Sequence, residues 1–276
     1  MAEAEASPLA RFTRRRLTTF AALATYRCAP LAELDIPARR VATIVWQRRH
    51  ANEQASVALA ERMISAAHAI GTSRNPEVIP ALTRLSRDEQ AHVTACASVL
   101  ETLGAPLAAP QPLRPHPSGE EPMLSFSRDV LMGLVVCETV SAARFAVVRR
   151  HTDILAIRRL IDAFLRDEVA HAGLGFALVP IAIHFTTRVL GAQRGKAWIC
   201  RELLSAMAEL EAVVGLDGAR RGLPPVRPQP KGNPGIVEPG LDARAFYDAV
   251  TRRILPRLDA CRVDITHEWR HRFDVP

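Results

Sequence analysis

The sequence has few cysteines, almost no lysine and no long apolar run, and each shortage narrows the class of protein. The five cysteines are an odd number, lie far apart and form no CxxC pair. A disulfide-stapled framework is therefore excluded, and a reducing, cytoplasmic location is expected. No apolar run reaches the roughly 18 to 20 residues that cross a bilayer. The nearest candidate, residues 172–185, is short and contains Pro180, so we expect no membrane partner.

Positive charge is in excess, but nearly all of it comes from arginine. Lysine and arginine exceed aspartate and glutamate by 36 − 29 = 7, and only Lys196 and Lys231 are lysines. A GC-rich genome can produce such an arginine bias without any functional cause. The pattern therefore favours solvated surface charge, and nucleic acid is not an expected partner.

Apolar residues recur every three or four positions in long segments that glycine and proline separate, and strand-like alternation is almost absent. The sequence therefore predicts an all-helical protein. We expect a first long helix over residues 37–70 and a second from 76 to 103, with Asn75 as its cap. A third helix is expected over 127–150, capped by Ser127, and a fourth after the short link 151–153.

A proline-rich connection, residues 106–122, joins two predicted helical hairpins. Because proline excludes helix there, we expect an extended crossover and a four-helix bundle with one long connection, built from residues 41–185. Residues 186–276 are expected to add helices at about 187–214 and 242–261, with a loop at 222–240. We interpret residues 1–276 as a single domain with N-terminal and C-terminal additions to the bundle.

The pattern Asp-Glu-x-Ala-His occurs twice, in the second and in the fourth predicted helix. The two copies are Asp88–His92 and Asp167–His171. A glutamate and a histidine three residues apart project from one helix face, so each pair can bind a metal ion from one side. Carboxylate oxygen and imidazole nitrogen suit iron or manganese. One such pair occurs often by chance, whereas two in helices of matching position indicate a metal site.

Each predicted hairpin carries a further glutamate in its other helix, Glu53 in the first and Glu138 in the second. Both begin a repeated Glu-x-x-Ser-x-Ala pattern. Folded about a pseudo-two-fold axis, the two halves bring four carboxylates and two imidazoles to one point. The Glu and His pairs lie on apolar stripes, where an ionised carboxylate costs on the order of several kcal/mol unless it is paired or metal-bound. The sequence therefore predicts a dinuclear metal site.

Glu61 is a second candidate for the ligand in the first helix. It lies on nearly the same stripe as Glu53 and is spaced more symmetrically from Glu89 about the intervening turn. The repeated sequence context favours Glu53. Asp88 and Asp167 precede the paired glutamates, and we expect each to accept the outer N–H of a ligand histidine and so fix its tautomer.

These motifs resemble those of the ferritin-like di-iron carboxylate superfamily. Residues 53–58 and 137–139 resemble a little-characterised bacterial ferritin-like group within it. The resemblance covers about residues 41–185 and implies a ferritin-like bundle that holds two iron ions, or a pair that contains manganese. It further implies Glu89 and Glu168 as bridges. The metal ligands that it implies are Glu53, Glu89, His92, Glu138, Glu168 and His171.

The function expected from this resemblance is that of a non-haem di-iron oxidoreductase. It would activate dioxygen and oxidise or oxygenate a small organic substrate, with electrons from a donor that the sequence does not identify. Iron handling, with Fe(II) itself as the substrate of a ferroxidase, is the alternative. A metal-free interaction bundle is a further hypothesis. Peroxide reduction of the rubrerythrin type would need CxxC pairs, which this chain lacks.

Chain length favours the enzyme over iron storage, because about 90 residues follow Phe185. We expect these segments to wall off an apolar cavity beside the metals, lined in part by Cys96, Cys137, Ala142 or Phe164. They could equally form the interface of a homodimer.

Overall fold

The computed structural model describes residues 7–15, 29–71, 75–110, 112–113, 115–213, 223 and 232–272, and every regular element within these ranges is helical. The all-helical prediction is therefore confirmed. The three longest helices are α4 (Ile36–Ile70), α5 (Val78–Thr102) and α8 (Leu155–Leu190). A further long stretch runs without interruption through three elements: α6 (Pro122–Asp129), the π-helix η1 (Val130–Cys137) and α7 (Glu138–His151).

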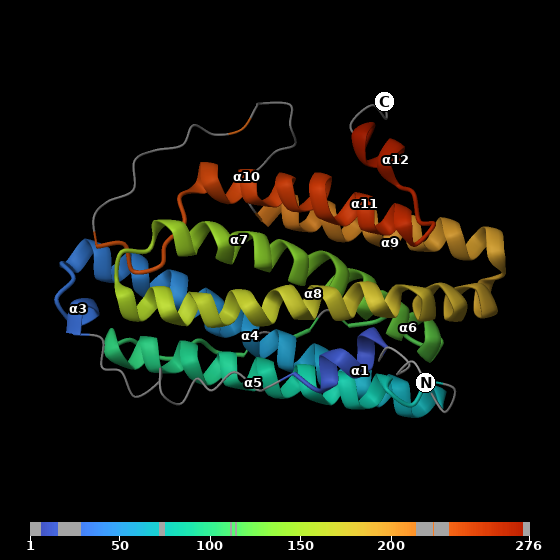
Figure 1. Cartoon of the computed structure of the whole chain (residues 1–276), viewed down its shortest axis with the longest axis horizontal. Coiled ribbons are helices and arrows are strands. Elements are labelled where there is room, and N and C mark those ends of the chain that lie inside the picture. Colours follow the sequence, from blue (N-terminus) through green and yellow to red (C-terminus); the bar gives the residue numbers. More distant parts are fainter. Residues whose placement is uncertain are drawn as a thin grey trace, which may run out of the picture.

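These long elements form two hairpins that lie side by side (Figure 1). In the first hairpin α4 packs along α5, and in the second α7 packs along α8. Residues 105–121 connect the hairpins, and those of them that the structure describes contain no helix, as the prolines predict. Two side-chain contacts fix this connection: Gln47 Nε2 donates to the Pro106 carbonyl at 2.9 Å, and His116 Nε2 lies 2.9 Å from Asp129 Oδ1.

The structure corrects two predicted helix starts. Helix α5 begins at Val78 rather than at Pro76, and Asn75 contributes only its carbonyl, which accepts from the Val78 N–H at 3.1 Å. The third long stretch begins at Pro122 and not at Ser127, because Glu121 caps it by accepting from the Met123 N–H at 2.7 Å. Ser127 lies inside the helix, where its hydroxyl donates to the Met123 carbonyl.

The C-terminal helices also differ from the prediction at their starts. Helix α8 continues through Pro180 to Leu190, and α9 (Ala192–Val213) begins only after Gly191, which has a φ of +78°. The last long stretch begins at Pro239, three residues earlier than predicted, and comprises α10 (Pro239–Ala249), η3 (Val250–Ile254) and α11 (Leu255–Ala260). About half of the predicted 222–240 loop lies outside the described residues.

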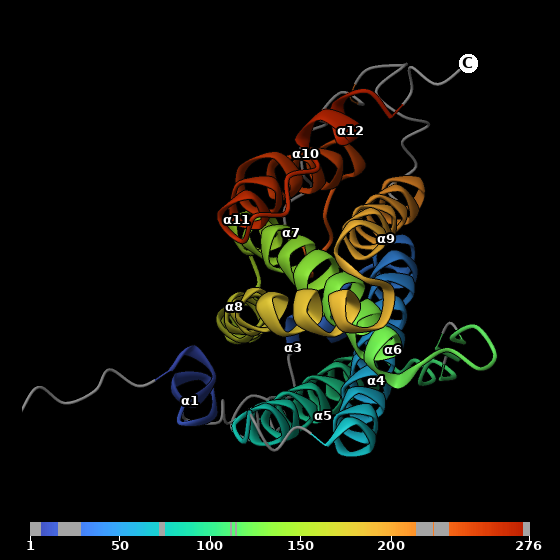
Figure 2. The ribbon, with the colours of Figure 1, turned by 90° about the vertical axis from the view of Figure 1, so that its right-hand side faces the viewer.

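The shorter helices lie on opposite sides of the paired hairpins (Figure 2). Helix α1 (Pro8–Thr13) packs against α5 and α8, and α3 (Ala29–Ala32) precedes α4. Helices α9, α10 and α11 cover the other side, where they share an apolar core with η1, α7 and α8. The last helix of the described part of the chain is α12 (Thr266–Arg270).

Two helical stretches, Pro122–His151 and Leu155–Leu190, are long and apolar enough to cross a membrane by length and composition alone. Neither stretch is an uninterrupted apolar run in the sequence, because polar residues interrupt both. More than half of the qualifying window in each stretch is buried inside the protein. Core helices commonly have this property, so it is weak support for a membrane span.

Candidate metal centre

The six side chains predicted as metal ligands meet in the interior between the two hairpins. Helix α4 supplies Glu53, α5 supplies the pair Glu89 and His92, α7 supplies Glu138, and α8 supplies the pair Glu168 and His171. Each of the six is at most 6% exposed. The sequence therefore places these charged residues where a helix otherwise buries apolar side chains.

The six residues form two overlapping groups of ligand atoms, and in each group one such atom per residue lies within 4.8 Å of the others. The first group is Glu53, Glu89, His92 and Glu168; the second is Glu89, Glu138, Glu168 and His171. Glu89 and Glu168 belong to both groups. Two shared carboxylates between two ligand sets are what a pair of bridged metal ions requires. We call these six residues the carboxylate–histidine cluster.

Both imidazoles turn the same ring nitrogen toward the carboxylates. His92 Nδ1 lies 3.3 Å from Glu53 Oε2 and 3.4 Å from Glu89 Oε2. His171 Nδ1 lies 2.8 Å from Glu89 Oε1. Glu89 therefore reaches one histidine with each of its two oxygens, which places it at the centre of the cluster.

The outer ring nitrogen of each histidine, Nε2, faces an aspartate, and this aspartate belongs to the other Asp-Glu-x-Ala-His motif. His92 Nε2 lies 3.4 Å from Asp167 Oδ2, and His171 Nε2 lies 3.5 Å from Asp88 Oδ2. Each aspartate thus contacts the histidine of the opposite helix rather than that of its own motif. A proton held on Nε2 by an aspartate leaves the Nδ1 lone pair directed at the cluster, which is the tautomer that binds metal.

Two arginines hold these aspartates, and a phenylalanine covers one imidazole. Arg84 Nε donates to both carboxylate oxygens of Asp88, at 2.9 and 3.1 Å, and Arg15 Nη2 donates to Asp167 Oδ1 at 3.3 Å. The ring of Phe12, on α1, lies edge-on to His171 with centroids 6.0 Å apart. The i,i+4 spacing of Arg84 and Asp88 was a usable sequence signal. No local pattern relates Arg15 to Asp167, 152 residues away.

Burial and the neighbouring charges shift the pKa values of five residues in the cluster. Burial raises the pKa of Glu53 to about 7, and burial beside Glu138 raises the pKa of Glu168 well above its usual value. Burial alone would lower the pKa values of His92 and His171, but the surrounding carboxylates raise both well above normal. These two imidazoles in turn keep the pKa of Glu89 below its ordinary value despite its burial.

Several buried polar atoms of the cluster lack hydrogen-bond partners among the described residues. Both carboxylate oxygens of Glu89 and Nδ1 of His171 make no hydrogen bond, although two of these atoms lie 2.8 Å apart. Buried polar groups are nearly always satisfied, so such atoms call for a missing partner. The unsatisfied atoms are oxygen and nitrogen lone-pair donors that converge, and the donor set therefore fits metal ions.

A π-helical segment sets the register of Glu138. Element η1 ends at Cys137, and the Glu138 N–H donates to the Gly133 carbonyl, five residues earlier. Segments of this kind often occur at functional sites, and no pattern in the sequence predicts this one. Gly175, one turn beyond His171, lets α8 touch η1 directly: a Cβ at this position would lie 2.6 Å from the Leu134 carbonyl carbon.

A cavity of about 590 Å³ opens on the glutamate side of the cluster. Glu53, Glu138 and Glu168 contribute to its lining, and most of the remaining wall comes from α4, α7 and the start of α10. We call it the α4–α7 cavity. Its volume is typical of small-molecule sites. The position beside the cluster agrees with the expectation from the sequence.

The residues expected to line this cavity were predicted wrongly, because none of Cys96, Cys137, Ala142 and Phe164 contributes to its wall. Cys96 and Phe164 are fully buried in the core, and the centroid of the Phe164 ring lies 4.6 Å from that of His92. Ala142 is buried, and Cys137 is exposed elsewhere on the surface. The cavity wall is instead a mixture of apolar side chains, arginines and carboxylates.

Glu61 and His50, both on α4, lie outside both ligand groups. Glu61 is exposed on α4, so the structure favours Glu53 as the glutamate of the first helix. His50 is buried, and its Nδ1 has no hydrogen-bond partner among the described residues.

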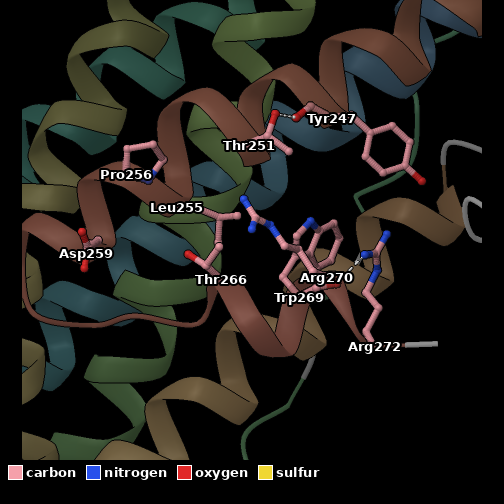
Figure 3. Close-up of a pocket in the computed structure, with 9 residues that line it drawn as sticks. All are labelled: Tyr247, Thr251, Leu255, Pro256, Asp259, Thr266, Trp269, Arg270 and Arg272. Carbon is pink, nitrogen blue, oxygen red and sulfur yellow. Dashed lines mark hydrogen bonds between the residues drawn. The ribbon is translucent and has the colours of Figure 1, made fainter. Parts of the chain in front are cut away.

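A second cavity, of about 540 Å³, lies among the C-terminal helices (Figure 3). It is bounded by α10, α11 and α12, with Tyr247, Leu255 and Trp269 among its lining residues. No residue of the carboxylate–histidine cluster contributes to it. This cavity is therefore separate from the carboxylate–histidine cluster.

Comparisons of the chain with protein-family models, with curated proteins and with solved structures give no match.

Proposed function

We propose that this chain is a ferritin-like di-iron carboxylate protein, with α4, α5, α6–α7 and α8 as the four helices of its bundle. We further propose that it is a non-haem di-iron oxidoreductase that activates dioxygen to oxidise or oxygenate a small organic substrate. The observation that carries this proposal is the pair of buried four-residue ligand groups that share Glu89 and Glu168. Carboxylate and imidazole donors without thiolate suit two iron ions, or a pair that contains manganese.

The ligand set matches two divalent cations in charge. Four glutamates supply four negative charges, and the two histidines bind as neutral imidazoles when their Nε2 protons face Asp88 and Asp167. A bound iron pair would supply electrons to dioxygen. In an oxygenation, one oxygen atom enters a substrate C–H bond and the other leaves as water, with two protons and two electrons from an external donor.

The α4–α7 cavity favours substrate oxidation over iron storage. It has the volume of a small organic molecule, and side chains such as Val45, Phe145 and Val148 give it apolar walls beside the carboxylates. A route for Fe(II) would be narrow and polar. The alternative function, a ferroxidase, shares the same cluster, so the stoichiometry of iron consumption distinguishes the two.

The test is anaerobic reconstitution with Fe(II), followed by metal analysis and exposure to air. We expect about two iron ions per chain, a change in visible absorption when oxygen is admitted, and turnover of only a few irons per chain. A stoichiometry below one iron per chain would refute the metal centre. A large assembly that mineralises hundreds of irons would refute the oxidase and establish the ferroxidase.

A further inference from the structure

The α4–α7 cavity has two chemically different ends. At one end are the carboxylates of Glu53, Glu138 and Glu168. Toward the N-terminal half of α4 the lining contains Arg48 and Arg49, about one helical turn, or roughly 6 Å of axial rise, before Glu53. A molecule in the cavity can therefore reach both the cluster and these two arginines, while the α4 wall continues past them to Ile44 and Val45.

Arg48 and Arg49 are the two arginines of the lining that no ion pair neutralises within the described part of the chain. The third arginine of the lining, Arg144, is paired with Asp242 through two contacts of 2.6 and 2.7 Å. The lining glutamates belong to the carboxylate–histidine cluster. Within the described part of the chain, neither Arg48 nor Arg49 forms an ion pair with a carboxylate. Both arginines thus keep a charge that no directly bound carboxylate neutralises, and Glu53 and Asp242 act on Arg49 only from beyond ion-pair distance.

Arg49 is held in place by neutral groups. Its guanidinium lies 4.6 Å from the centroid of the Trp46 ring and 5.7 Å from that of Phe145, and Nη2 donates to the Gly235 carbonyl. Its Nη1 is buried without a hydrogen-bond partner among the described residues. Burial lowers the pKa of Arg49 only to about 10, so the side chain stays charged near neutral pH. An arginine fixed in this way is preorganised for an anion.

The segment that holds Arg49 is itself rigidly folded. The side-chain oxygen of Asn233 accepts from the backbone N–H groups of Gly235 and Ile236, at 3.0 and 2.7 Å. Gly235 has a φ of +90°, and Trp46 Nε1 donates to the Pro234 carbonyl at 3.0 Å. The next residues, Val237 and Pro239, form part of the cavity wall. The wall beside the arginines is therefore fixed to α4.

We propose that the α4–α7 cavity binds a small organic carboxylic acid, with its carboxylate toward Arg48 and Arg49 and its apolar body toward the carboxylate–histidine cluster. The planar guanidinium fork matches a carboxylate, and the apolar walls match a hydrocarbon body. That this acid is the molecule oxidised rests on the proposed function; that it binds does not. The proposal thus adds a substrate class to the reaction.

The first test compares acids and alcohols of equal length. Hexanoate, octanoate and decanoate, and the corresponding 1-alkanols, are titrated calorimetrically into the metal-free chain. The titrations are repeated with the chain loaded with Mn(II) and kept under anaerobic conditions, so that no oxidation occurs. We expect the best acid to bind at least about tenfold more tightly than its alcohol, the effect of a charge-assisted hydrogen bond. Equal affinities, or no binding by any of the three acids, would overturn the proposal.

The second test assigns the preference to the arginines. We expect Arg48→Gln and Arg49→Gln each to reduce the preference for the acid to less than about threefold. Arg40→Gln is the matched control, since Arg40 is exposed on the same helix and outside the cavity lining. Arg49→Lys keeps the charge and most of the packing, so we expect it to retain most of the preference for the acid. It therefore distinguishes the loss of charge in Arg49→Gln from misfolding. Loss of the preference in Arg40→Gln, or its persistence in both glutamine variants, would contradict the proposal.

Metal content separates this inference from the proposed function. If the chain binds two metals but shows no preference for acids, the substrate class is wrong and the di-iron centre stands. If the metal-free chain prefers acids but does not bind two metals, the proposed function fails and the binding site stands. If the preference appears only with Mn(II) and survives in both glutamine variants, the carboxylate binds the metals and the arginine site is refuted.

Discussion

The two sides of the carboxylate–histidine cluster differ in how tightly the protein encloses them. On the histidine side, His92 and His171 are fully buried, and the aspartates that face them are held by Arg15 and Arg84. On the other side, Glu53, Glu138 and Glu168 contribute to the wall of a cavity of about 590 Å³. The protein therefore fixes the nitrogen ligands and leaves the glutamates next to open space.

This difference indicates which side a reactant would approach. Helix α1 packs against α5 and α8 on the closed side, whereas Pro239 and Asp242 of α10 contribute to the cavity wall on the open side. Substitutions on the closed side should therefore change metal binding and stability. Substitutions in the cavity wall should change ligand binding and leave the metals in place.

The largest effect is expected from the residue at the centre of both sides. Glu89→Ala removes the carboxylate that reaches both histidines, and it should reduce the bound metal from about two ions per chain to fewer than one. Glu53→Ala should weaken one of the two positions. Metal analysis after anaerobic reconstitution measures both, with Glu61→Ala as the exposed control on α4. Retention of two ions by Glu89→Ala would mean that it is not a bridge.

Close packing beneath the closed side should also be sensitive to small changes. In Gly175→Ala the added methyl group would meet the backbone and Cβ of Leu134 at 2.6 to 2.7 Å, and we expect a loss of about 2 kcal/mol of unfolding free energy. Gly173→Ala, two residues earlier on α8, meets nothing within 4 Å and should be neutral or slightly stabilising. Denaturant unfolding compares the two variants. Equal stabilities would show that α8 and η1 can move apart without cost.

The aspartates of the closed side should change the affinity for metal without being metal ligands. Asp88→Asn keeps the shape of the side chain but weakens its hold on the Nε2 proton of His171, and we expect metal affinity to fall about tenfold with the stoichiometry near two. Competition with a chelator measures this change. Asp248→Asn, an exposed substitution on α10, serves as the control. Complete loss of metal in Asp88→Asn would make Asp88 a ligand.

The smallest expected effect is the pH dependence of stability, which arises from the glutamates on the open side. Glu53 and Glu168 have raised pKa values in the folded chain, so the stability that their protonated forms provide is present at low pH and is lost as pH rises. For Glu53 this loss extends from about pH 4.5 to about pH 7. We expect the melting temperature of the metal-free chain to fall by on the order of 5 °C across this window. In excess Mn(II) the trend should reverse, because deprotonated ligands bind metal.

Substitution tests whether Glu53 causes this pH dependence. Glu53→Gln cannot ionise, so the metal-free variant should lose a part of the dependence between pH 4.5 and 7, whereas Glu61→Gln should retain all of it. Thermal melts at several pH values provide the comparison. Identical profiles for the wild type and Glu53→Gln would remove Glu53 from the explanation.

The ligand pattern was predictable because helices repeat every 3.6 residues. Spacing alone places Glu89 with His92, and Glu168 with His171, on one face of each helix, and the repeated Glu-x-x-Ser-x-Ala context favours Glu53 over Glu61. Helix starts were predicted less well, since Asn75 and Ser127 are good capping residues that the structure does not use as caps. Glu121 and Pro122, which begin the third long stretch, lay within the segment interpreted as the crossover.

The sequence by itself determined the helical class, the paired hairpins and the six residues that meet between them, because all of these follow from periodicity within single helices and from glycine and proline between them. The tertiary structure alone decided which aspartate faces which histidine, the contact of Arg15 with Asp167, the π-helical register of Glu138 and the wall of the α4–α7 cavity. These features join residues far apart in the chain, where no local period relates one position to the other. They depend on how the helices pack, and a side chain that packs against a distant helix leaves no regular pattern in the sequence.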